Sequence, residues 1–298
     1  MSDAQAHRGQ TVAAFVLVTL IWGSTWFVIR DQLAHVPAAW NVAWRFLVAS
    51  IGMVALARAR GASLRLPAGG QRLAALIGLT QFCGNYEFVY QAERHLTSGV
   101  VAVIVALLLV PNALLSALFL GTRVSRRFLA GSAVAIAGIA LLLAHEARLA
   151  PAGNAVLLGV ALSVAAMLSA SIANVLQAGE VARRTGGVPL MAWSMIWGAG
   201  IDTVFALLTA GPPVIDPRPA WFLGTAYLAI IGSVVTFPLY FLLIRRMGAG
   251  PAAYNSVATP VIAMGLSTLF EGYRWDALAV SGSILAMAGM VIALGGRR

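Results

Sequence analysis

The sequence predicts an all-α membrane protein of ten transmembrane helices, arranged as two inverted five-helix repeats around a central cavity. The first observation is composition, since 60% of the 298 residues are hydrophobic, 10% are charged and the mean hydropathy is +0.87. Soluble domains carry about 25% charged residues. The second is the spacing of the charges, and the third is a similarity between the two halves. A disordered chain, a disulfide-rich domain and a water-soluble enzyme are excluded.

Long stretches without charge define the helices in order. Seven stretches contain no Asp, Glu or Arg, and the chain contains no Lys; they are 9–29, 95–122, 128–145, 149–179, 219–244, 247–270 and 277–296. Three similar stretches carry one charge each, with Arg45 in 39–57, Glu87 in 73–91 and Asp202 in 190–210. About 20 apolar residues cross the hydrocarbon core as a helix. The sequence therefore predicts ten spans.

The arginines in the connections predict the orientation of the spans. If the connections alternate between the two sides, one side receives Arg8, Arg58, Arg60, Arg65, Arg72, Arg123, Arg126, Arg127, Arg183, Arg184, Arg245, Arg246, Arg297 and Arg298. The other side receives Arg30, Arg94, Arg148, Arg218 and Arg274. Because cytoplasmic loops are enriched in arginine, we expect both termini in the cytoplasm. The basic charge is spread over short loops, which argues against a nucleic-acid partner.

The two halves, 1–148 and 149–298, share three features in the same order. The Gly-Ser segments at 131–138 and 282–289 match, as do the prolines Pro111 and Pro260, and the segments 94–99 and 245–250. Five spans per repeat is an odd number, so the second copy enters the bilayer from the opposite side. Inverted repeats of this kind enclose a substrate site at the midplane of alternating-access carriers.

Several motifs resemble the drug/metabolite transporter superfamily in its ten-helix EamA-type branch, and within it the bacterial aromatic amino acid exporters. They are Trp22-Gly23-Ser24-Thr25, Arg45-Phe46, and Pro111 followed by Leu120-Gly121. The resemblance covers essentially the whole chain. It implies an inner-membrane exporter with a basket-like bundle of helices 1–4 and 6–9 around the central cavity, and the fifth and tenth helices pack outside this basket. Glu271 follows Pro260 by eleven positions as in the family, whereas Thr122 occupies the corresponding place in the first half.

Polar and aromatic side chains within the spans are the candidates for a substrate cavity, because such groups avoid lipid and face the bundle interior. Small hydroxyl residues among them could equally serve as contacts between helices. The amides and phenols suit a neutral or zwitterionic ligand with an apolar side chain. The candidates are Trp22, Ser24, Thr25, Gln81, Asn85, Tyr86, Tyr90, Asn174, Thr236, Tyr240, Tyr254 and Asn255.

Two prolines and three charges within the spans have further candidate roles. Pro111 and Pro260 each remove one backbone hydrogen bond, which produces either a packing kink or a hinge. Arg45 and Glu87 are expected in the outer third of the bilayer as an ion pair, with a role as structural pair, gate or proton site. Asp202 has no evident partner, and a water-filled crevice would accommodate it. Arg45, Glu87 and Asp202 are therefore the candidates for gating or coupling.

The function predicted from the sequence is export of amino acids and related small metabolites by a secondary transporter of broad specificity. We expect a small-molecule substrate, a lipid environment, no metal and no cofactor, with a proton gradient as a candidate energy source. Three alternatives stay open at this point. A carrier of phosphorylated or nucleotide-sugar metabolites would need Lys or Arg in the cavity. An intramembrane aspartyl enzyme would need a second carboxylate beside Asp202. A channel would use a similar lining, and the oligomeric state is not assigned.

Overall fold

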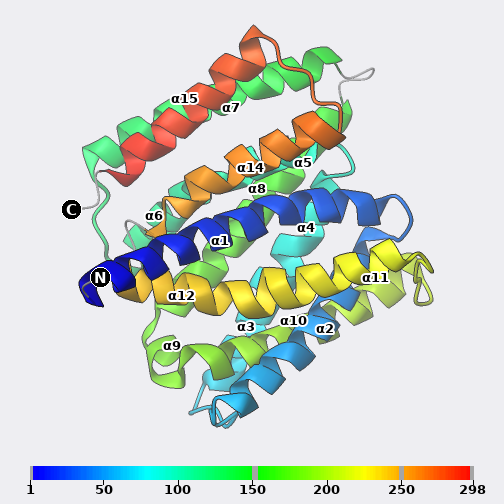
Figure 1. Cartoon of the computed structure of the whole chain (residues 1–298), viewed down its shortest axis with the longest axis vertical. Coiled ribbons are helices and arrows are strands. Elements are labelled where there is room, and N and C mark those ends of the chain that lie inside the picture. The colour runs from blue at the N-terminus through cyan, green and yellow to red at the C-terminus, as the bar shows by residue number, and fades with distance from the viewer. Residues whose placement is uncertain (1–2, 150–153, 248–251, 296–298) are drawn as a thin grey trace.

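The structure is a computed structural model that describes residues 3–149, 154–247 and 252–295 (Figure 1). The described residues form helices and connections without a β-strand. In the first half the helices are α1 (Asp3–Leu33), α2 (Ala38–Ala59), α3 (Gly70–Ile77), η1 (Gly78–Gly84), α4 (Asn85–Ala92), α5 (Ser98–Ala106), α6 (Leu109–Leu120) and α7 (Arg126–Leu149). In the second half they are α8 (Asn154–Ala178), α9 (Glu180–Thr185), α10 (Gly187–Ala210), α11 (Pro219–Ala226), η2 (Tyr227–Val235), α12 (Thr236–Met247), α14 (Asn255–Phe270) and α15 (Ala277–Leu294).

Eight helical segments of the described residues are long and apolar enough to cross a membrane. They include the continuous segments Ser98–Leu120 and Pro219–Tyr240, each of which contains more than one labelled element. The two other expected spans differ in form. The stretch 73–91 is a run of α3, η1 and α4, and α14 in the stretch 247–270 has 16 residues. The multi-pass helical architecture is thus confirmed, while the number of ten spans stays a prediction.

Two π-helical segments interrupt the bundle at corresponding places in the two halves. The segment η1 begins at Gly78 and η2 begins at Tyr227, which is 227 − 78 = 149 positions later, the same offset as between Pro111 and Pro260. In a π-helix the hydrogen bonds span five residues, so the turns are wider. The hydroxyl of Ser233 follows this geometry and donates to the Leu228 carbonyl oxygen at 2.9 Å.

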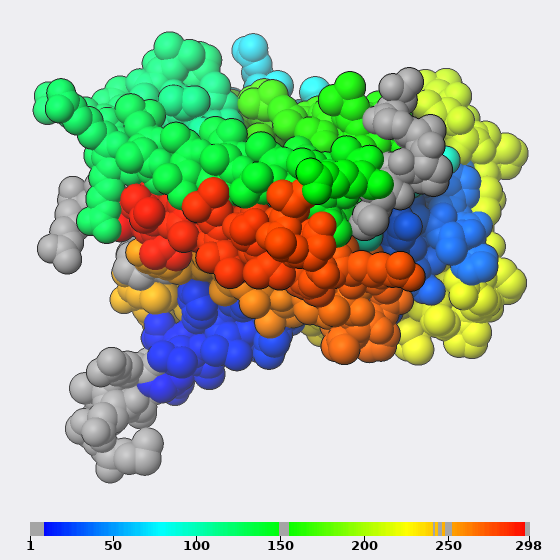
Figure 2. All heavy atoms as spheres, turned by 90° about the horizontal axis from the view of Figure 1, so that it is seen from above, coloured from blue at the N-terminus to red at the C-terminus, as the bar shows by residue number. Residues whose placement is uncertain are grey.

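The helices α7 and α15 form a separate layer on the outside of the bundle (Figure 1), and Figure 2 shows their surfaces side by side. Their contact is made between backbones. A Cβ atom added to Gly138 would lie 2.2 Å from the Ala286 nitrogen, and one added to Gly289 would lie 2.2 Å from the Ala135 nitrogen. The two Gly-Ser segments that the sequence shares between its halves therefore pack against each other within one molecule.

We name the two ends of the bundle by the helices that begin or end there. The near end is the one at which α1 begins and α15 ends, and the far end is the opposite one (Figure 1). At the far end α4 leads into α5 through the turn 93–97, and α14 leads into α15 through the turn 271–276. These positions place the cavity described next.

Candidate functional site

A cavity of about 320 Å³ lies between the helices of the two halves. Its side chains come from α1, η1, α4, α5, α6, α8, α10, α12 and α14. The lining residues closest to the near end are Gln177 at the end of α8, Met191 at the start of α10 and Ala253 before α14. The cavity therefore extends from the middle of the bundle toward the near end.

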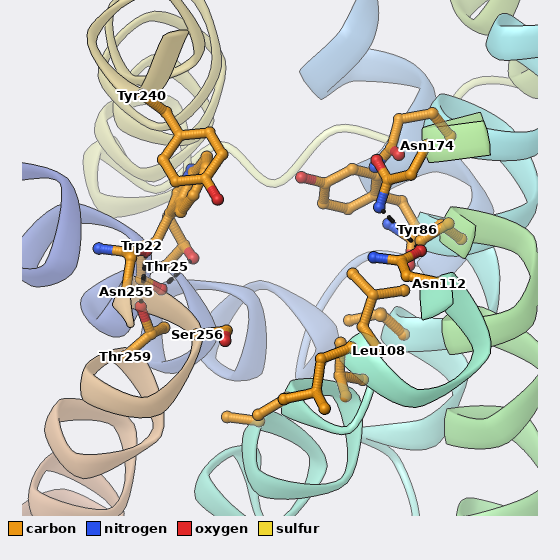
Figure 3. A pocket seen from close by; sticks show the side chains of 18 of the residues that line it. Trp22, Thr25, Tyr86, Leu108, Asn112, Asn174, Tyr240, Asn255, Ser256 and Thr259 are labelled. Carbon is orange, nitrogen blue, oxygen red and sulfur yellow. Dashed lines mark hydrogen bonds between the residues drawn. The ribbon is translucent and has the colours of Figure 1, made fainter. Parts of the chain in front are cut away.

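One wall of the cavity is formed by α1, α12 and α14 (Figure 3). The Asn255 amide donates to the Thr19 hydroxyl at 2.7 Å, and the Asn255 side-chain oxygen lies 3.3 Å from the Thr259 hydroxyl that donates to it. The Trp22 indole N–H donates to the Gly232 carbonyl oxygen at 3.2 Å, and its ring lies 5.1 Å from the Tyr240 ring. These contacts fix the orientation of the polar and aromatic groups on this wall.

The opposite wall is formed by α4, α6 and α8, with η1 beside them (Figure 3). The Asn174 amide donates to the Asn112 side-chain oxygen at 3.3 Å, which joins α8 to α6. Asn85 is 7% exposed, and its side-chain oxygen has no hydrogen-bond partner among the described residues. A buried amide oxygen without a partner costs about 1–3 kcal/mol. This wall therefore has hydrogen-bonding capacity that a ligand can use.

The chemistry of the lining is neutral. None of the described residues that line the cavity is Asp, Glu, Lys or Arg. The amides of Gln81, Asn85, Asn112, Asn174 and Gln177 can donate or accept. Aromatic rings, including Trp26 and Phe237, supply apolar area and faces for a cation. The lining offers hydrogen bonds and π-faces to a ligand, without a fixed countercharge.

Eight of the twelve side chains that the sequence nominated for the cavity line it. They are Trp22, Thr25, Gln81, Asn85, Tyr86, Asn174, Tyr240 and Asn255. The other four do not. Ser24 lies 2.7 Å from the Tyr227 hydroxyl, and Thr236 donates to the Ile231 carbonyl oxygen. Tyr90 is fully buried in the core, and Tyr254 lines a separate depression with Phe15 and Met247.

Other lining residues were not singled out from the sequence, and Asn112, Gln177 and Phe237 are three of them. Asn112 is the only Asn or Gln in the stretch 95–122 and follows Pro111 directly, which is a signal that sequence reasoning could have used. Gln177 lies near the end of an expected span, where a polar residue is unremarkable in sequence terms. Phe237 has no distinguishing signal, because it lies in an apolar segment.

The two prolines occupy different positions relative to the cavity. Pro260 lines it, whereas Pro111 is buried in α6 and is not among the lining residues. The carbonyl of Leu107, which a proline four residues later cannot bond, accepts the Val110 N–H at 2.7 Å. Helix α5 ends and α6 begins at this tight turn. The break satisfies the carbonyl in the way a backbone within the membrane requires.

The expected ion pair between Arg45 and Glu87 is not formed, and that prediction was wrong. The Arg45 guanidinium carbon lies 4.4 Å from the centre of the Tyr86 ring, and its Nη2 lies 3.5 Å from the Ser233 hydroxyl. Neighbouring helical positions differ by about 100° around the axis. The face of α4 that carries Tyr86 meets Arg45, so Glu87 points elsewhere, and its two oxygens have no hydrogen-bond partner among the described residues.

Asp202 does not face a water-filled crevice, which corrects the second expectation about a charge. Its exposed fraction is 0%, and it does not line the cavity. Cys83 and Glu87 lie close enough to interact with it electrostatically. Helix α10 packs tightly against η1 here, since a Cβ atom on Gly198 would lie 2.6 Å from the Phe82 Cβ. Close packing excludes water from this position.

Comparison with known proteins identifies the family. The family model described as "EamA-like transporter family" matches residues 10–144 and again 157–295. The "Uncharacterized inner membrane transporter YedA" of Escherichia coli K12 is 31% identical over 275 residues, which are 90% of this chain and 86% of that protein. The "Probable amino-acid metabolite efflux pump" of Salmonella typhimurium LT2 is 25% identical over 294 residues, which are 95% and 94% of the two chains.

One solved crystal structure has the same fold. It has a TM-score of 0.70 at 19% identity and covers 96% of this chain and 96% of its own. The two family matches together span 274 residues (135 in 10–144 and 139 in 157–295), most of the 298-residue chain. The chain therefore belongs to the EamA-like transporter family of the drug/metabolite transporter superfamily and is a multi-pass membrane transporter.

Proposed function

We propose that the chain exports amino acids and related small metabolites from the cytoplasm, with broad specificity, by alternating access across the bacterial inner membrane. The observation that carries this proposal is the neutral cavity lined by amides and aromatic rings. The names of relatives support it, since one is named "Probable amino-acid metabolite efflux pump" and another "Uncharacterized inner membrane transporter YedA".

The lining matches the chemistry of a zwitterion with an apolar side chain. The amides of Gln81 and Asn85 can donate to a carboxylate and accept from an ammonium group, so both charges are satisfied without a fixed ion. Trp22 and Tyr86 add aromatic surface for the side chain or the ammonium group. The volume of about 320 Å³ is at the lower end of the range for small-molecule sites.

The alternative carriers and enzymes fit the lining less well. A phosphorylated or nucleotide-sugar substrate carries multiple negative charges, which are bound by Arg and Lys in proteins. Such groups are missing among the described lining residues. An intramembrane aspartyl enzyme would use two carboxylates in contact with its substrate. Glu87 and Asp202 lie near each other but outside the cavity.

Alternating access rests on two inverted repeats, 1–148 and 149–298, with ten spans in total. The double match of one family model supports this division, as does the equal spacing of the π-helical segments and the prolines. The arginine distribution supports a near end that faces the cytoplasm. The cavity extends toward that end, so the described state has the far end closed.

Counterflow in proteoliposomes tests the function. Vesicles loaded with unlabelled phenylalanine should accumulate labelled phenylalanine transiently, because a carrier exchanges one solute for another. A channel cannot do so, and absence of counterflow for a panel of neutral amino acids would contradict the proposal. Labelled glucose 6-phosphate serves as the negative arm, and its counterflow would favour the phosphorylated-substrate alternative.

Dependence on a proton gradient is a separate part of the proposal and is assigned to Glu87, with Asp202 beside it. If Glu87 couples proton movement, Glu87→Gln abolishes transport driven by a pH gradient and leaves amino-acid exchange intact. Unchanged dependence on the gradient would count against this role. Arg45, stacked on Tyr86 at the cavity wall, is a gating candidate through that ring.

A further inference from the structure

The cavity is closed toward the far end by three side chains that are almost completely buried. These roof residues are Ile29 of α1, Val89 of α4 and Ala102 of α5, with exposed fractions of 2%, 3% and 2%. A solute can pass to the far end only if these three helices move apart. The groups that hold the helices together just beyond the roof therefore control that path.

A cluster of polar groups lies directly beyond the roof. Arg30 follows Ile29 in α1, Glu93 lies one turn after Val89, and Ser98 lies one turn before Ala102. Arg30 is exposed, and its guanidinium donates to the main-chain carbonyl oxygen of Glu93. This hydrogen bond ties α1 to the turn between α4 and α5.

A second connection joins α5 to the end of α14. The Glu271 carboxylate accepts hydrogen bonds from the Ser98 N–H at 3.0 Å and from the Ser98 hydroxyl. The Gly99 N–H donates to the Ser267 hydroxyl at 2.9 Å. Orphan N–H groups and the helix dipole favour an anion at this position. The Glu271 side chain therefore links the start of α5 to the end of α14 in the closed far end.

The side chain of Glu93 has no such partners. Its exposed fraction is 0%, and neither carboxyl oxygen has a hydrogen-bond partner among the described residues. The charged and titratable groups that interact with it are Arg30 of α1, Arg45 of α2, Tyr90 of α4 and Glu271 after α14. An ionised carboxylate that is dry and unbonded is costly, so the closed form favours the neutral acid.

We propose that Glu93 is a proton-binding site that controls the opening of the far end, so that binding of a proton there holds the roof closed. This inference rests on the alternating access proposed above. When the roof opens, water reaches the carboxyl group and the proton leaves to the solution at the far end. The resulting carboxylate is then solvated and can pair with the neighbouring Arg30.

The direction of the pH effect follows from this exchange. Burial raises the pKa of Glu93, the neighbouring Glu271 raises it further, and Arg30 and Arg45 lower it less than these two raise it. In the open form, with water present, the pKa returns toward about 4.3. The closed form is therefore favoured at low pH and is destabilised as the pH rises above the open-form value. One carboxyl group changes the ratio of open to closed by at most about tenfold per pH unit.

Cysteine labelling measures this opening directly. In a Cys83→Ser background, Ala102→Cys reports on the roof and Ala34→Cys, at an exposed position of the far end, reports on reagent reactivity. An impermeant maleimide is added to right-side-out and to inside-out membrane vesicles. The polarity in which Ala34→Cys is labelled identifies the side of the far end, so a wrong orientation is recognised separately.

The ratio of roof labelling to Ala34→Cys labelling is the readout, from about pH 5 to about pH 9 at the far-end side. We expect the ratio to rise by about an order of magnitude. Glu93→Gln should keep it low throughout, because the amide mimics the neutral acid. Glu93→Asp should retain the rise, and so should the control Glu146→Gln, a carboxyl group of α7 outside the cluster. A flat ratio with Glu93 present, or a rise that persists in Glu93→Gln, overturns the proposal.

A measurement without the amide variant covers the case in which Glu93→Gln does not fold. Infrared titration of the Ala102→Cys protein should show a protonated carboxyl band that disappears with the same midpoint as the rise in labelling. Glu93→Asp should shift both midpoints together. A rise in labelling while the acid bands stay constant would overturn the proposal.

Discussion

Asn112 and Asn174 form one hydrogen bond across the cavity wall, and its removal tests whether this wall binds substrate. Asn112→Leu deletes one amide and leaves Asn174 unpaired beside the ligand. A net contribution of about 1–1.5 kcal/mol corresponds to roughly a tenfold change in binding. We expect the KM for phenylalanine counterflow to rise by about tenfold in initial-rate measurements.

The matched variants distinguish a shared site from general damage. Asn174→Leu should have a similar effect, and the double variant should lose less than the sum of the two because they share one interaction. Thr209→Val, at an exposed position of α10, should leave the KM unchanged. An unchanged KM in Asn112→Leu would show that this wall is structural.

The spacing of residues along the sequence predicted on which face of a helix a side chain lies, but it did not predict how far along the cavity that side chain lies. Gln81, Asn85 and Tyr86 were correctly placed together on one side of the helical run. Tyr90 lies on the same stripe as Tyr86 but one turn farther on, beyond the roof at Val89. For Arg45 and Glu87, the similar expected depth in the bilayer suggested an ion pair, but the two side chains point in different directions. Their directions around the two helices depend on packing that a single sequence does not contain.

At the scale of elements, the contact between α7 and α15 has no room for a side chain. Gly138→Ala would place a Cβ atom 2.2 Å from the Ala286 backbone, so the helices must move apart. Overpacking of this kind costs about 1–3 kcal/mol. We expect a lower melting temperature for the purified protein in detergent, measured by size-exclusion fluorescence after heating.

Gly200 provides the control for this substitution. It lies inside α10, and an added Cβ atom would meet nothing within 4 Å. Gly200→Ala should therefore leave the melting temperature unchanged or raise it, because alanine restricts the unfolded chain. Equal melting temperatures for the Gly138 and Gly200 variants would contradict the close packing.

Substitution of the two prolines tests whether the helix breaks act as hinges. Replacement of both Pro111 and Pro260 by Ala restores two backbone hydrogen bonds, so we expect normal expression. If the helix breaks act as hinges, the double variant should transport poorly in proteoliposomes. Normal counterflow would show that the prolines are packing kinks. The single variant Pro260→Ala should have the larger effect, because Pro260 lines the cavity.

The existence of the helices could be predicted, whereas their interruptions could not. Charge-free stretches are a strong signal because each charge within lipid is costly. The π-helical segment η2 is apolar on nearly all sides, and η1 carries polar side chains only at Thr80 and Gln81, so neither segment has a periodicity that distinguishes its wider turns from an α-helix. The break at Leu107 was expected from Pro111, but the direction of the resulting bend depends on neighbouring helices.

At the scale of the whole molecule, the orientation in the membrane is a testable prediction. The arginine bias predicts that both termini face the cytoplasm. Fusion of a reporter that is active only in the cytoplasm should give activity at either terminus, and a reporter active only in the periplasm should give none. A reporter that places the two termini on opposite sides would contradict an even number of spans, and with it the paired repeats.

The backbone contact between α7 and α15 also limits how this molecule can change shape. Each helix is the last one described in its half, and their backbones touch at Gly138 and Gly289. Separation of the two backbones would open a gap that no side chain can fill, so we expect α7 and α15 to stay fixed relative to each other. Spin labels on α7 and α15 should keep a constant separation under all conditions. The distance between labels on α1 and α10 should then report any rearrangement, and α7 with α15 can serve as the fixed reference on which the conformational states are superposed.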